Sequence, residues 1–391
     1  QGWTAHCPTR IVFGANALSH LPSLISEDRV LLLTTMGSTR RGLTNRIVEL
    51  LRPRKVTVCD RVPPNIDIEH IDQLAHEFVD LQPDCIIGAG GGSAIDSAKV
   101  LSRLMPVSNK LTFRALLEED KPYDDLKSSI PVIAIPTTAG TGAEVTPFAT
   151  VWDREALVKH SFTFDDPYPA TALLDPKLTL SLPRDLTLST GLDALCQALE
   201  SLWSVRSNPV SRAYAQTALP GIIRTMPLVL DTLGDLELRT RMMEYSLLAG
   251  LAIAISKTTL SHSISYPLTL HMGVPHGLAC SLTIVQVLEL NSSHDEQGIN
   301  RLVRTVGFSE AGELAKQLRD LLERTGAYKT LSNYVVDRET LVGFASQAIT
   351  TGRADNNPVQ VSVSNVEDIL GAAFDEIRLT KNAKTTRVNT Q

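Results

Sequence analysis

The chain has 391 residues, of which 43% are hydrophobic and 20% are charged, and its formal net charge is −6. This composition is ordinary for a globular protein, and the length allows two domains with a sizeable core. The negative charge argues against a nucleic-acid partner, and no hydrophobic run approaches the roughly 20 residues of a membrane-spanning helix. Five scattered cysteines without a Cys-x-x-Cys pair, and a first segment unlike a signal peptide, favour a cytoplasmic location.

The pattern of hydrophobic residues predicts two domains, over residues 1–185 and 186–391. In the first, short hydrophobic strands alternate with helical stretches, which is typical of a parallel sheet. Strands are expected over residues 30–33, 55–58, 85–87, 132–135 and 172–174. The second domain is predicted to be helical, with helices over residues 236–255 and 311–325. We expect the two domains to pack together and to hold a cofactor and a metal between them.

The segment after the first predicted strand, residues 34–42, bears on the choice of nucleotide cofactor. NAD selectivity usually uses an acidic residue that binds the adenosine ribose, and this segment has none. Gly37 and Ser38 leave room for a 2′-phosphate, and Arg40 or Arg41 could pair with it. We therefore expect NADP(H) to be favoured over NAD(H).

A glycine-rich turn follows the strand at 85–87. Gly91, Gly92 and Ser93 stand between this strand and a predicted helix, an arrangement in which bare backbone N–H groups and the helix dipole face a phosphate. A second loop follows the strand at 132–135 and offers the hydroxyls of Thr137, Thr138 and Thr141, which could bind ribose, phosphate or nicotinamide. The glycine-rich turn predicts a phosphate-binding site, whereas the second loop, taken alone, could also be an ordinary polar turn.

Metal ligands are predicted in the second domain. Asp193 and Gln197 are four residues apart and share one face of a predicted helix. With His262 and His276, they would offer one carboxylate and two imidazoles to zinc or another divalent transition metal, such as iron. The amide oxygen of Gln197 is a much poorer ligand than an imidazole, so metal occupancy is left open.

These motifs together resemble the iron-containing (group III) alcohol dehydrogenases over essentially the whole chain. The resemblance implies an α/β N-terminal dinucleotide-binding domain and an all-α C-terminal domain, the dehydroquinate synthase-like fold. It implies that residues 91–93 hold the pyrophosphate, that residues 137–141 form a cofactor loop, and that Asp96, Lys159 and Asn65 lie near the cofactor. Asp193, His262 and His276 match the ligands of the family, whereas position 197 would be a histidine there. We expect a small-molecule substrate and a homodimer.

Three segments resemble the phosphonate-metabolism branch of this family in particular: residues 146–153, 188–195 and 260–269. That branch implies reduction of phosphonoacetaldehyde to 2-hydroxyethylphosphonate. Lys257, expected in a helix about one and a half turns before His262, is the candidate for binding the phosphonate, and Arg206 is a weaker one. Tyr266 stands where the family often has a proton-relay histidine, so we expect it to relay the proton.

Other interpretations of the same residues stay open. Within the family, the chain could be a general alcohol or diol dehydrogenase, or a maleylacetate reductase. The scaffold class also includes cyclising lyases of the dehydroquinate synthase type, although the motifs argue against these. The alternative from another functional class is a nucleotide-binding protein that has lost catalysis because Gln197 replaces a metal ligand.

Overall fold

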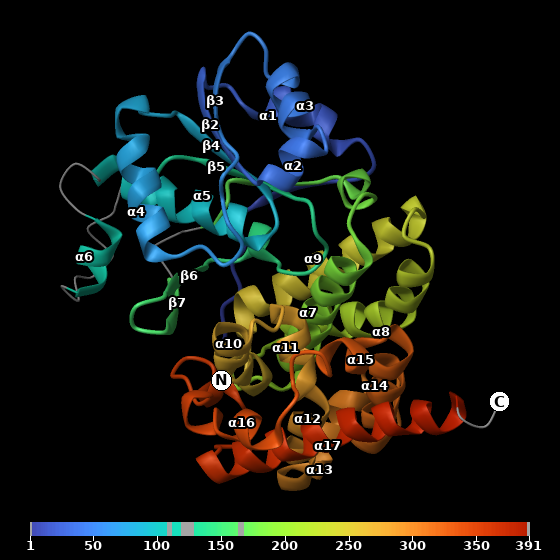
Figure 1. Ribbon diagram of the computed structural model, residues 1–391. Coiled ribbons are helices and arrows are strands. Elements are labelled where there is room, and N and C mark those ends of the chain that lie inside the picture. The colour runs from blue at the N-terminus through green and yellow to red at the C-terminus, as the bar shows by residue number, and fades with distance from the viewer. Residues whose placement is uncertain (1, 108–111, 119–128, 163–167, 389–391) are drawn as a thin grey trace. The chain divides into compact units, whose positions relative to one another are not determined.

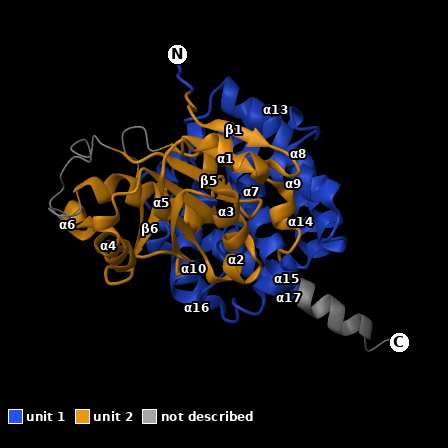
Figure 2. Ribbon diagram, turned by 90° about the horizontal axis from the view of Figure 1, so that it is seen from above, with its two compact units in different colours: residues 1–5, 183–391 blue, residues 6–182 orange. Residues whose placement is uncertain are grey.

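The computed structural model describes residues 2–107, 112–118, 129–162 and 168–388. The chain forms two compact units, which Figure 2 shows in different colours: residues 6–182, and residues 1–5 together with 183–391. The sequence suggested a boundary after residue 185. In the structure the chain passes from one unit to the other at Leu182 and Pro183, and the first five residues belong with the second unit.

The unit of residues 6–182 is built on a six-stranded parallel sheet in the order β1-β8-β5-β4-β2-β3 (Figure 1). The predicted parallel sheet is therefore confirmed. A separate antiparallel hairpin, β6 with β7, was not predicted, and neither was β1. The strands are β1 (Arg10–Phe13), β2 (Arg29–Thr34), β3 (Lys55–Cys59), β4 (Cys85–Gly90), β5 (Val132–Pro136), β6 (Ala149–Asp153), β7 (Val158–Phe162) and β8 (Thr171–Leu174).

Both faces of the sheet are covered, which explains its hydrophobic strands. Every residue of β4 and β5 is buried, as expected for central strands between two layers. Along β2 the side chains alternate between two hydrophobic clusters: Leu31 and Leu33 join one, Val30 and Leu32 the other. The helices of this unit are α1 (Leu21–Leu24), α2 (Met36–Arg40), α3 (Leu43–Leu50), α4 (Ile68–Glu77), α5 (Gly92–Leu104) and α6 (Phe113–Glu118).

The order in which the chain adds strands to the sheet reverses between β2 and β4. From β2 the chain continues to β3 on one side, whereas from β4 it continues to β5 on the other. The carboxyl ends of neighbouring strands at such a point leave a crevice between diverging connections, where α/β proteins bind nucleotides. The segments predicted to bind the cofactor begin there, at α2 after β2 and at α5 after β4.

The second unit is helical, as predicted. Helices α7, α8 and α9 pack against one another, and α11 packs against α7. The helices are α7 (Arg184–Trp203), α8 (Pro209–Asp231), α9 (Leu236–Ser256), α10 (Leu260–Met272), α11 (His276–Leu282), α12 (Ile284–His294), α13 (Glu296–Arg304), α14 (Ala311–Thr325), α15 (Ala327–Leu331), α16 (Arg338–Val342) and α17 (Val363–Val388).

The placement of Lys257 within a helix is wrong. Helix α9 ends at Ser256, and α10 begins at Leu260 after a bend of 105°. Lys257 caps α9 with φ 54° and ψ 174°, a region that residues other than glycine rarely adopt and that costs about 1–3 kcal/mol. The break is stabilised by a buried carboxylate that binds the first backbone N–H groups of α10, and sequence periodicity gives no sign of this contact.

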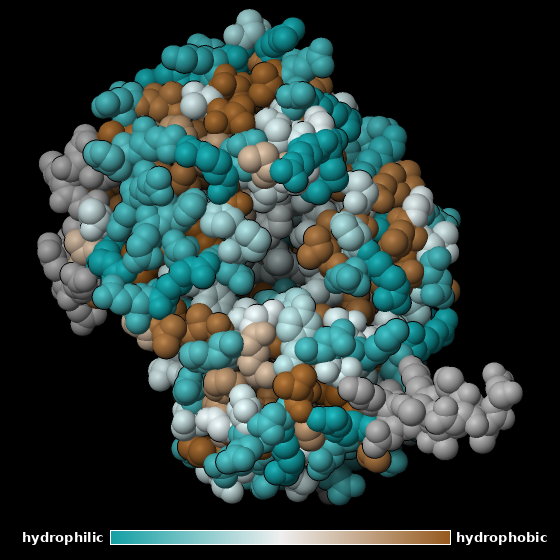
Figure 3. Space-filling view, viewed as in Figure 1, coloured by the Kyte–Doolittle hydropathy of each residue, from teal (hydrophilic) through white to brown (hydrophobic). Residues whose placement is uncertain are grey.

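Among the described residues, no single helix is long and apolar enough to cross a membrane, although the bent pair α9 and α10 passes that test when taken together. On the face seen in Figure 3, hydrophilic residues predominate and hydrophobic ones form separate groups. The exposed large hydrophobic side chains include Leu186 on α7 and Leu228 on α8.

Three ionisable side chains are buried where α5 meets the loop after β5. The Lys99 ammonium donates to the carbonyl oxygens of Thr146 and Phe148, at 3.2 and 2.8 Å, and lies 3.3 Å from Asp96 Oδ1. Asp96 Oδ2 in turn accepts from the backbone N–H of Thr150 at 2.9 Å. These contacts attach the loop and β6 to α5. Burial raises the pKa of the Glu144 carboxyl from 4.5 to about 7, with Lys99 opposing the shift.

Glu144 should make stability fall as the pH rises. Because its folded-state pKa lies above the unfolded value of 4.5, its contribution is complete below that pH and is lost as the pH rises through about 7. We expect the unfolding free energy of the wild type to drop, relative to Glu144→Gln, by up to about 3 kcal/mol between about pH 5 and pH 8. Urea unfolding across this range measures the difference, and parallel curves for the two proteins would contradict the assignment.

Candidate active site

The glycine-rich turn contains glycines of two kinds. A Cβ atom at Gly90 would lie 2.8 Å from Ala94 Cβ, so close packing requires glycine there, and one at Gly92 would lie 3.1 Å from Thr141 Cγ2, which is a tight contact. At Gly91, the N-cap of α5, the nearest atom would be 3.7 Å away, which is ordinary contact. Protein packing therefore does not require glycine at 91, but the approach of a phosphate to the α5 N-terminus would.

The second predicted cofactor loop lies beside this turn. Strands β4 and β5 are neighbours, and the backbone N–H of Thr137 donates to Gly90 O at 2.8 Å. Thr138 borders Gly91, and Thr141 borders Gly92. Hydroxyl-bearing side chains are thus brought to the start of α5, as expected for a loop that binds a dinucleotide.

Two more predicted cofactor residues approach α5 from elsewhere in the chain. Asn65, which has φ 54°, donates its backbone N–H to Ser93 Oγ at 3.1 Å. Lys159 on β7 lies with its ammonium 5.4 Å from the ring centre of Trp152. Burial raises the pKa of Asp96, while Lys99 and, more weakly, Lys159 lower it, so Lys159 also lies near Asp96. The hairpin of β6 and β7 is what carries Lys159 to this place.

The segment expected to select the cofactor contains the short helix α2. Thr35 caps α2 by accepting from Ser38 N at 3.2 Å, and Ser38 is buried. Gly37 is overlaid by Arg41, because a Cβ atom there would lie 3.1 Å from Arg41 Nη1. Arg40 is exposed in the last turn of α2. Of the two arginines, Arg41 is the one that folds back over the start of the helix.

In the helical unit, a buried carboxylate that the sequence did not reveal positions His262. Glu200 on α7 accepts from the backbone N–H groups of Thr259, Ser261 and His262, at 3.0, 2.8 and 3.4 Å. It also lies 2.6 Å from His262 Nδ1. Burial alone would raise the pKa of Glu200, but His262 and these N–H groups hold it below its ordinary value. A carboxylate on Nδ1 turns Nε2 toward a metal.

Four potential ligand atoms meet on α7, α10 and α11. Asp193, His262, His276 and Cys280 each offer an atom, and these atoms lie within 4.8 Å of one another. His262 Nε2 is 3.3 Å from Asp193 Oδ1, and Cys280 Sγ is 3.8 Å from both ring nitrogens of His276. One carboxylate and two imidazoles, with a thiol beside them, fit a divalent metal of the zinc or iron type.

Glycine 277 allows α11 to reach this position. A Cβ atom there would lie 1.8 Å from Ser189 O and 2.8 Å from Asp193 N, which no side chain could tolerate. Only glycine lets α11 lie directly on α7, so the residue after His276 brings both His276 and Cys280 to Asp193. Gln197, the remaining predicted ligand, donates from Nε2 to Asp193 Oδ1 at 3.0 Å.

Lys257, the residue predicted to bind the phosphonate, lies at the α9–α10 break with two other cations, Arg206 and Arg353, close enough to affect its pKa. Asn356, which is 2% exposed, accepts from Arg206 Nε at 2.8 Å and donates to Thr258 O and Gly352 O, at 3.0 and 2.8 Å. Asn356 thus ties Arg206 to the backbone at the residues next to Lys257 and Arg353. Burial lowers the pKa of half-buried Lys257, and Arg206 and Arg353 lower it further, opposed by Asp355.

Tyr266 connects this group with the metal ligands. Its hydroxyl accepts from Arg353 Nε at 3.0 Å, and its ring centre lies 6.5 Å from that of His276. Arg353 was not singled out from the sequence. His271, which the sequence left unassigned, lies 3.0 Å from Gln347 Oε1 and stacks on Phe344, so it supports the structure of α10.

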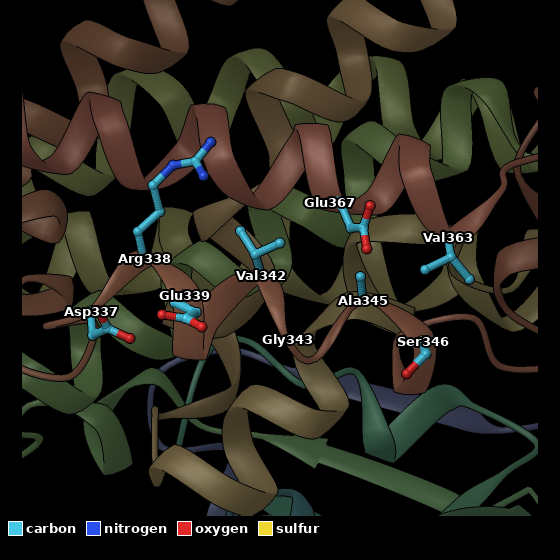
Figure 4. A pocket seen from close by; sticks show the side chains of 9 residues that line it. All are labelled: Asp337, Arg338, Glu339, Val342, Gly343, Ala345, Ser346, Val363 and Glu367. Carbon is cyan, nitrogen blue, oxygen red and sulfur yellow. The ribbon is translucent and has the colours of Figure 1, made fainter.

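A surface cavity of about 520 Å³ lies apart from these groups, between α16 and α17. Figure 4 shows Glu367 and Val363 on α17 facing Ala345 and Ser346 across it. It contains none of the predicted site residues. One of its carboxylates, Asp337, serves as the N-cap of α16. The metal-ligand cluster marks the chemical site better than this cavity does.

The chain is similar in sequence and structure to known dehydrogenases. Family models match it over residues 8–176 (iron-containing alcohol dehydrogenase) and 187–374 (the C-terminal part of the Fe-containing alcohol dehydrogenase family). It is 30% identical to phosphonoacetaldehyde reductase from Streptomyces viridochromogenes, with 92% of this chain and 94% of that protein covered. It is 28% identical to maleylacetate reductase from Burkholderia cepacia, with 94% and 96% covered.

Among solved structures, sulfoacetaldehyde reductase from Bifidobacterium kashiwanohense in complex with NAD+ has a TM-score of 0.88 and 27% identity, with 96% of this chain and 99% of that chain covered. The chain belongs to the iron-containing alcohol dehydrogenase family and is an oxidoreductase of that family. The family and the two-part fold expected from the motifs are thus confirmed.

The orientation of His262 by Glu200 predicts a loss of metal affinity in Glu200→Gln. The amide keeps the shape but cannot accept from His262 Nδ1 and the backbone N–H groups with the strength of a carboxylate. We expect the affinity for a divalent metal to fall about 10–100-fold, as is usual when an outer-shell partner is removed. Competition with a chromophoric chelator measures it. Glu237→Gln, an exposed change on α9, is the control, and equal affinities in both variants would contradict the role of Glu200.

Proposed function

We propose that the chain reduces phosphonoacetaldehyde to 2-hydroxyethylphosphonate with NAD(P)H, with NADPH favoured. The observation that supports a phosphonate substrate is the group of three cations, Lys257, Arg206 and Arg353, of which Arg353 contacts Tyr266. Arg206 and Arg353 both disfavour the charged form of Lys257, so the three cations repel one another, and a bound dianion would relieve that repulsion. In the part of the chain that the structure describes, no salt bridge neutralises the Lys257 ammonium.

The relatives support an anionic substrate. The names of two of them, phosphonoacetaldehyde reductase and sulfoacetaldehyde reductase, describe a two-carbon aldehyde that carries an anionic oxoacid group. Maleylacetate, named in the third, carries carboxylates instead. A maleylacetate reductase is therefore the second candidate, because the same cations could hold a dicarboxylate. A general alcohol or diol dehydrogenase would have no use for these cations.

Each part of the reaction has residues suited to it. When bound, the nicotinamide supplies the hydride and a divalent metal supplies Lewis acidity at the carbonyl oxygen. Asp193, His262 and His276 would hold the metal, while residues 91–93 and 137–141 would bind the dinucleotide. Lys257, with Arg206 and Arg353, would hold the phosphonate. Because the Tyr266 oxygen accepts from Arg353, its hydrogen is directed elsewhere, and Tyr266 would donate it to the developing alkoxide.

Strain at Lys257 makes the substrate proposal testable with two variants. Lys257→Gln removes the charge, and Lys257→Gly also relieves the backbone strain at φ 54°. Losing one charge-assisted contact of about 1.5–3 kcal/mol should raise KM for phosphonoacetaldehyde by about one to two decades in both variants. KM for an uncharged aldehyde of the same length should stay unchanged. Lys257→Gly should also unfold at higher denaturant concentration than the wild type.

The control is Lys316→Gln, an exposed lysine on α14. Equal losses for the charged and the uncharged aldehyde would make Lys257 a structural residue and contradict its role. If the wild type uses the uncharged aldehyde as efficiently as phosphonoacetaldehyde, the substrate proposal fails. A higher efficiency with maleylacetate would favour the second candidate.

The cofactor preference depends on α2. Residues 34–42 contain no acid, and Arg41 lies over the start of α2 while Arg40 lies in its last turn, which supports pairing of either arginine with a 2′-phosphate. We expect the combined change Arg40→Ala and Arg41→Ala to raise the Kd of NADPH about 10–100-fold and to change that of NADH much less. Fluorescence titration measures both constants, with Arg46→Ala as an exposed control. A wild-type preference for NADH, or equal weakening of both cofactors, would refute the preference.

A further inference from the structure

We propose that Cys280, rather than Gln197, completes the metal site, and that this donor set selects zinc over iron. The proposal concerns the site of the proposed function and rests on it for the presence of a metal. It changes the chemistry of that site, because a thiolate would stand where the family has a third imidazole.

The position of Cys280 follows from α11. His276 and Cys280 are four residues apart on this helix and therefore share a face. Gly277 holds that face against α7 at Asp193. Cys280 is fully buried, so its thiol meets the cluster rather than solvent. Nothing in this arrangement depends on a loop or on an exposed side chain.

The distances suit coordination. Zinc binds sulfur at about 2.3 Å and nitrogen or oxygen at about 2.0–2.2 Å, so neighbouring ligand atoms in a tetrahedral site lie roughly 3.3–3.8 Å apart. His262 Nε2 and Asp193 Oδ1 are 3.3 Å apart, and Cys280 Sγ is 3.8 Å from His276. The full set lies within 4.8 Å, so small side-chain rotations suffice to contract it around an ion.

Gln197 has a different task in this arrangement. Its Nε2 donates to Asp193 Oδ1 at 3.0 Å. An amide that gives its N–H to the carboxylate orients that carboxylate, as outer-shell partners of metal ligands do. Glu200 does the same for His262. The loss of an imidazole at 197 is thus offset by a thiol that reaches the cluster from the other helix.

The donor set determines the preferred metal. Thiolates are soft ligands that favour zinc, whereas imidazole and carboxylate alone discriminate less. Asp193 and Cys280 would also bring two negative charges to a dication. A set of Asp193 with three imidazoles would bring one. The thiolate therefore both strengthens the site for zinc and lowers its net positive charge.

Cobalt(II) spectroscopy tests the thiolate without relying on activity. The protein is stripped with a chelator and titrated with Co²⁺. We expect a sulfur-to-cobalt charge-transfer band in the near ultraviolet for the wild type. Cys280→Ser and Cys280→Ala should lack the band and lose at least about 100-fold in zinc affinity, more than the loss typical of an outer-shell change. Absence of the band in the wild type would overturn the proposal without any variant.

Cys196 provides the matched control, since it is fully buried on α7 and close to Cys280 but outside the ligand cluster. Cys196→Ala should keep the band. A band that survives in Cys280→Ala, or disappears in Cys196→Ala alone, contradicts the assignment. Gln197→His combined with Cys280→Ala should recover metal binding without the band, which also shows that the Cys280→Ala site is folded.

Metal selection is tested with the metal-free wild type under anaerobic conditions. The protein is exposed to equal concentrations of Zn²⁺ and Fe²⁺, and the metal that it retains is measured. We expect zinc in the wild type and a larger share of iron in Gln197→His with Cys280→Ala. Iron retained in preference to zinc by the wild type would refute the selectivity. These readouts do not involve substrate, so a zinc thiolate site without phosphonoacetaldehyde reduction would refute the proposed function alone.

Discussion

The contact on which the helical unit depends is that of the buried Glu200 carboxylate with the start of α10. An isolated carboxylate would be costly to bury, but three backbone N–H groups and the His262 ring satisfy this one. The helix N-terminus adds its partial positive charge to the same point. One side chain on α7 thus fixes where α10 begins, how it is oriented and which nitrogen of His262 faces the ligand cluster.

That contact also explains the break that holds Lys257. Helix α9 could not continue into α10 without removing the N–H groups of Thr259, Ser261 and His262 from Glu200. The chain therefore turns at Lys257 and accepts a strained backbone there. Ser204, just beyond α7, binds Ser256 O at 2.7 Å and fixes the end of α9. The position of Lys257 and the position of His262 therefore both depend on how α7 contacts the α9–α10 break.

Much of the fold and part of the candidate site could be predicted from the sequence, because these features depend on residues close together in the chain. The buried strands, the glycine turn before α5 and the helices α9 and α14 follow from runs and periodicities of neighbouring residues. Edge strand β1 is only four residues long and partly exposed, so it lacks such a pattern. Glu200 and Cys280 act through contacts between separate helices, and Arg353 acts from a turn that contacts α10. The spacing of Cys280 from His276 and of Glu200 from Asp193, by one and two helical turns, was the available signal, but only tertiary structure shows that these faces meet.

In the helical unit, the metal-ligand cluster and the cation group carry opposite charges. With Asp193 and Cys280 both anionic, a bound dication would be neutralised by its own ligands, and Glu200 is matched by His262. A cluster of that kind would attract a phosphonate weakly. Lys257, Arg206 and Arg353 carry three positive charges against Asp355, so the dianion would be held there, and its aldehyde end would remain for the metal and Tyr266. A third imidazole in place of the thiolate would give the metal centre a net positive charge and make it compete for the phosphonate. On this reasoning, the thiolate at position 280 and the cations at the α9–α10 break suit the same substrate.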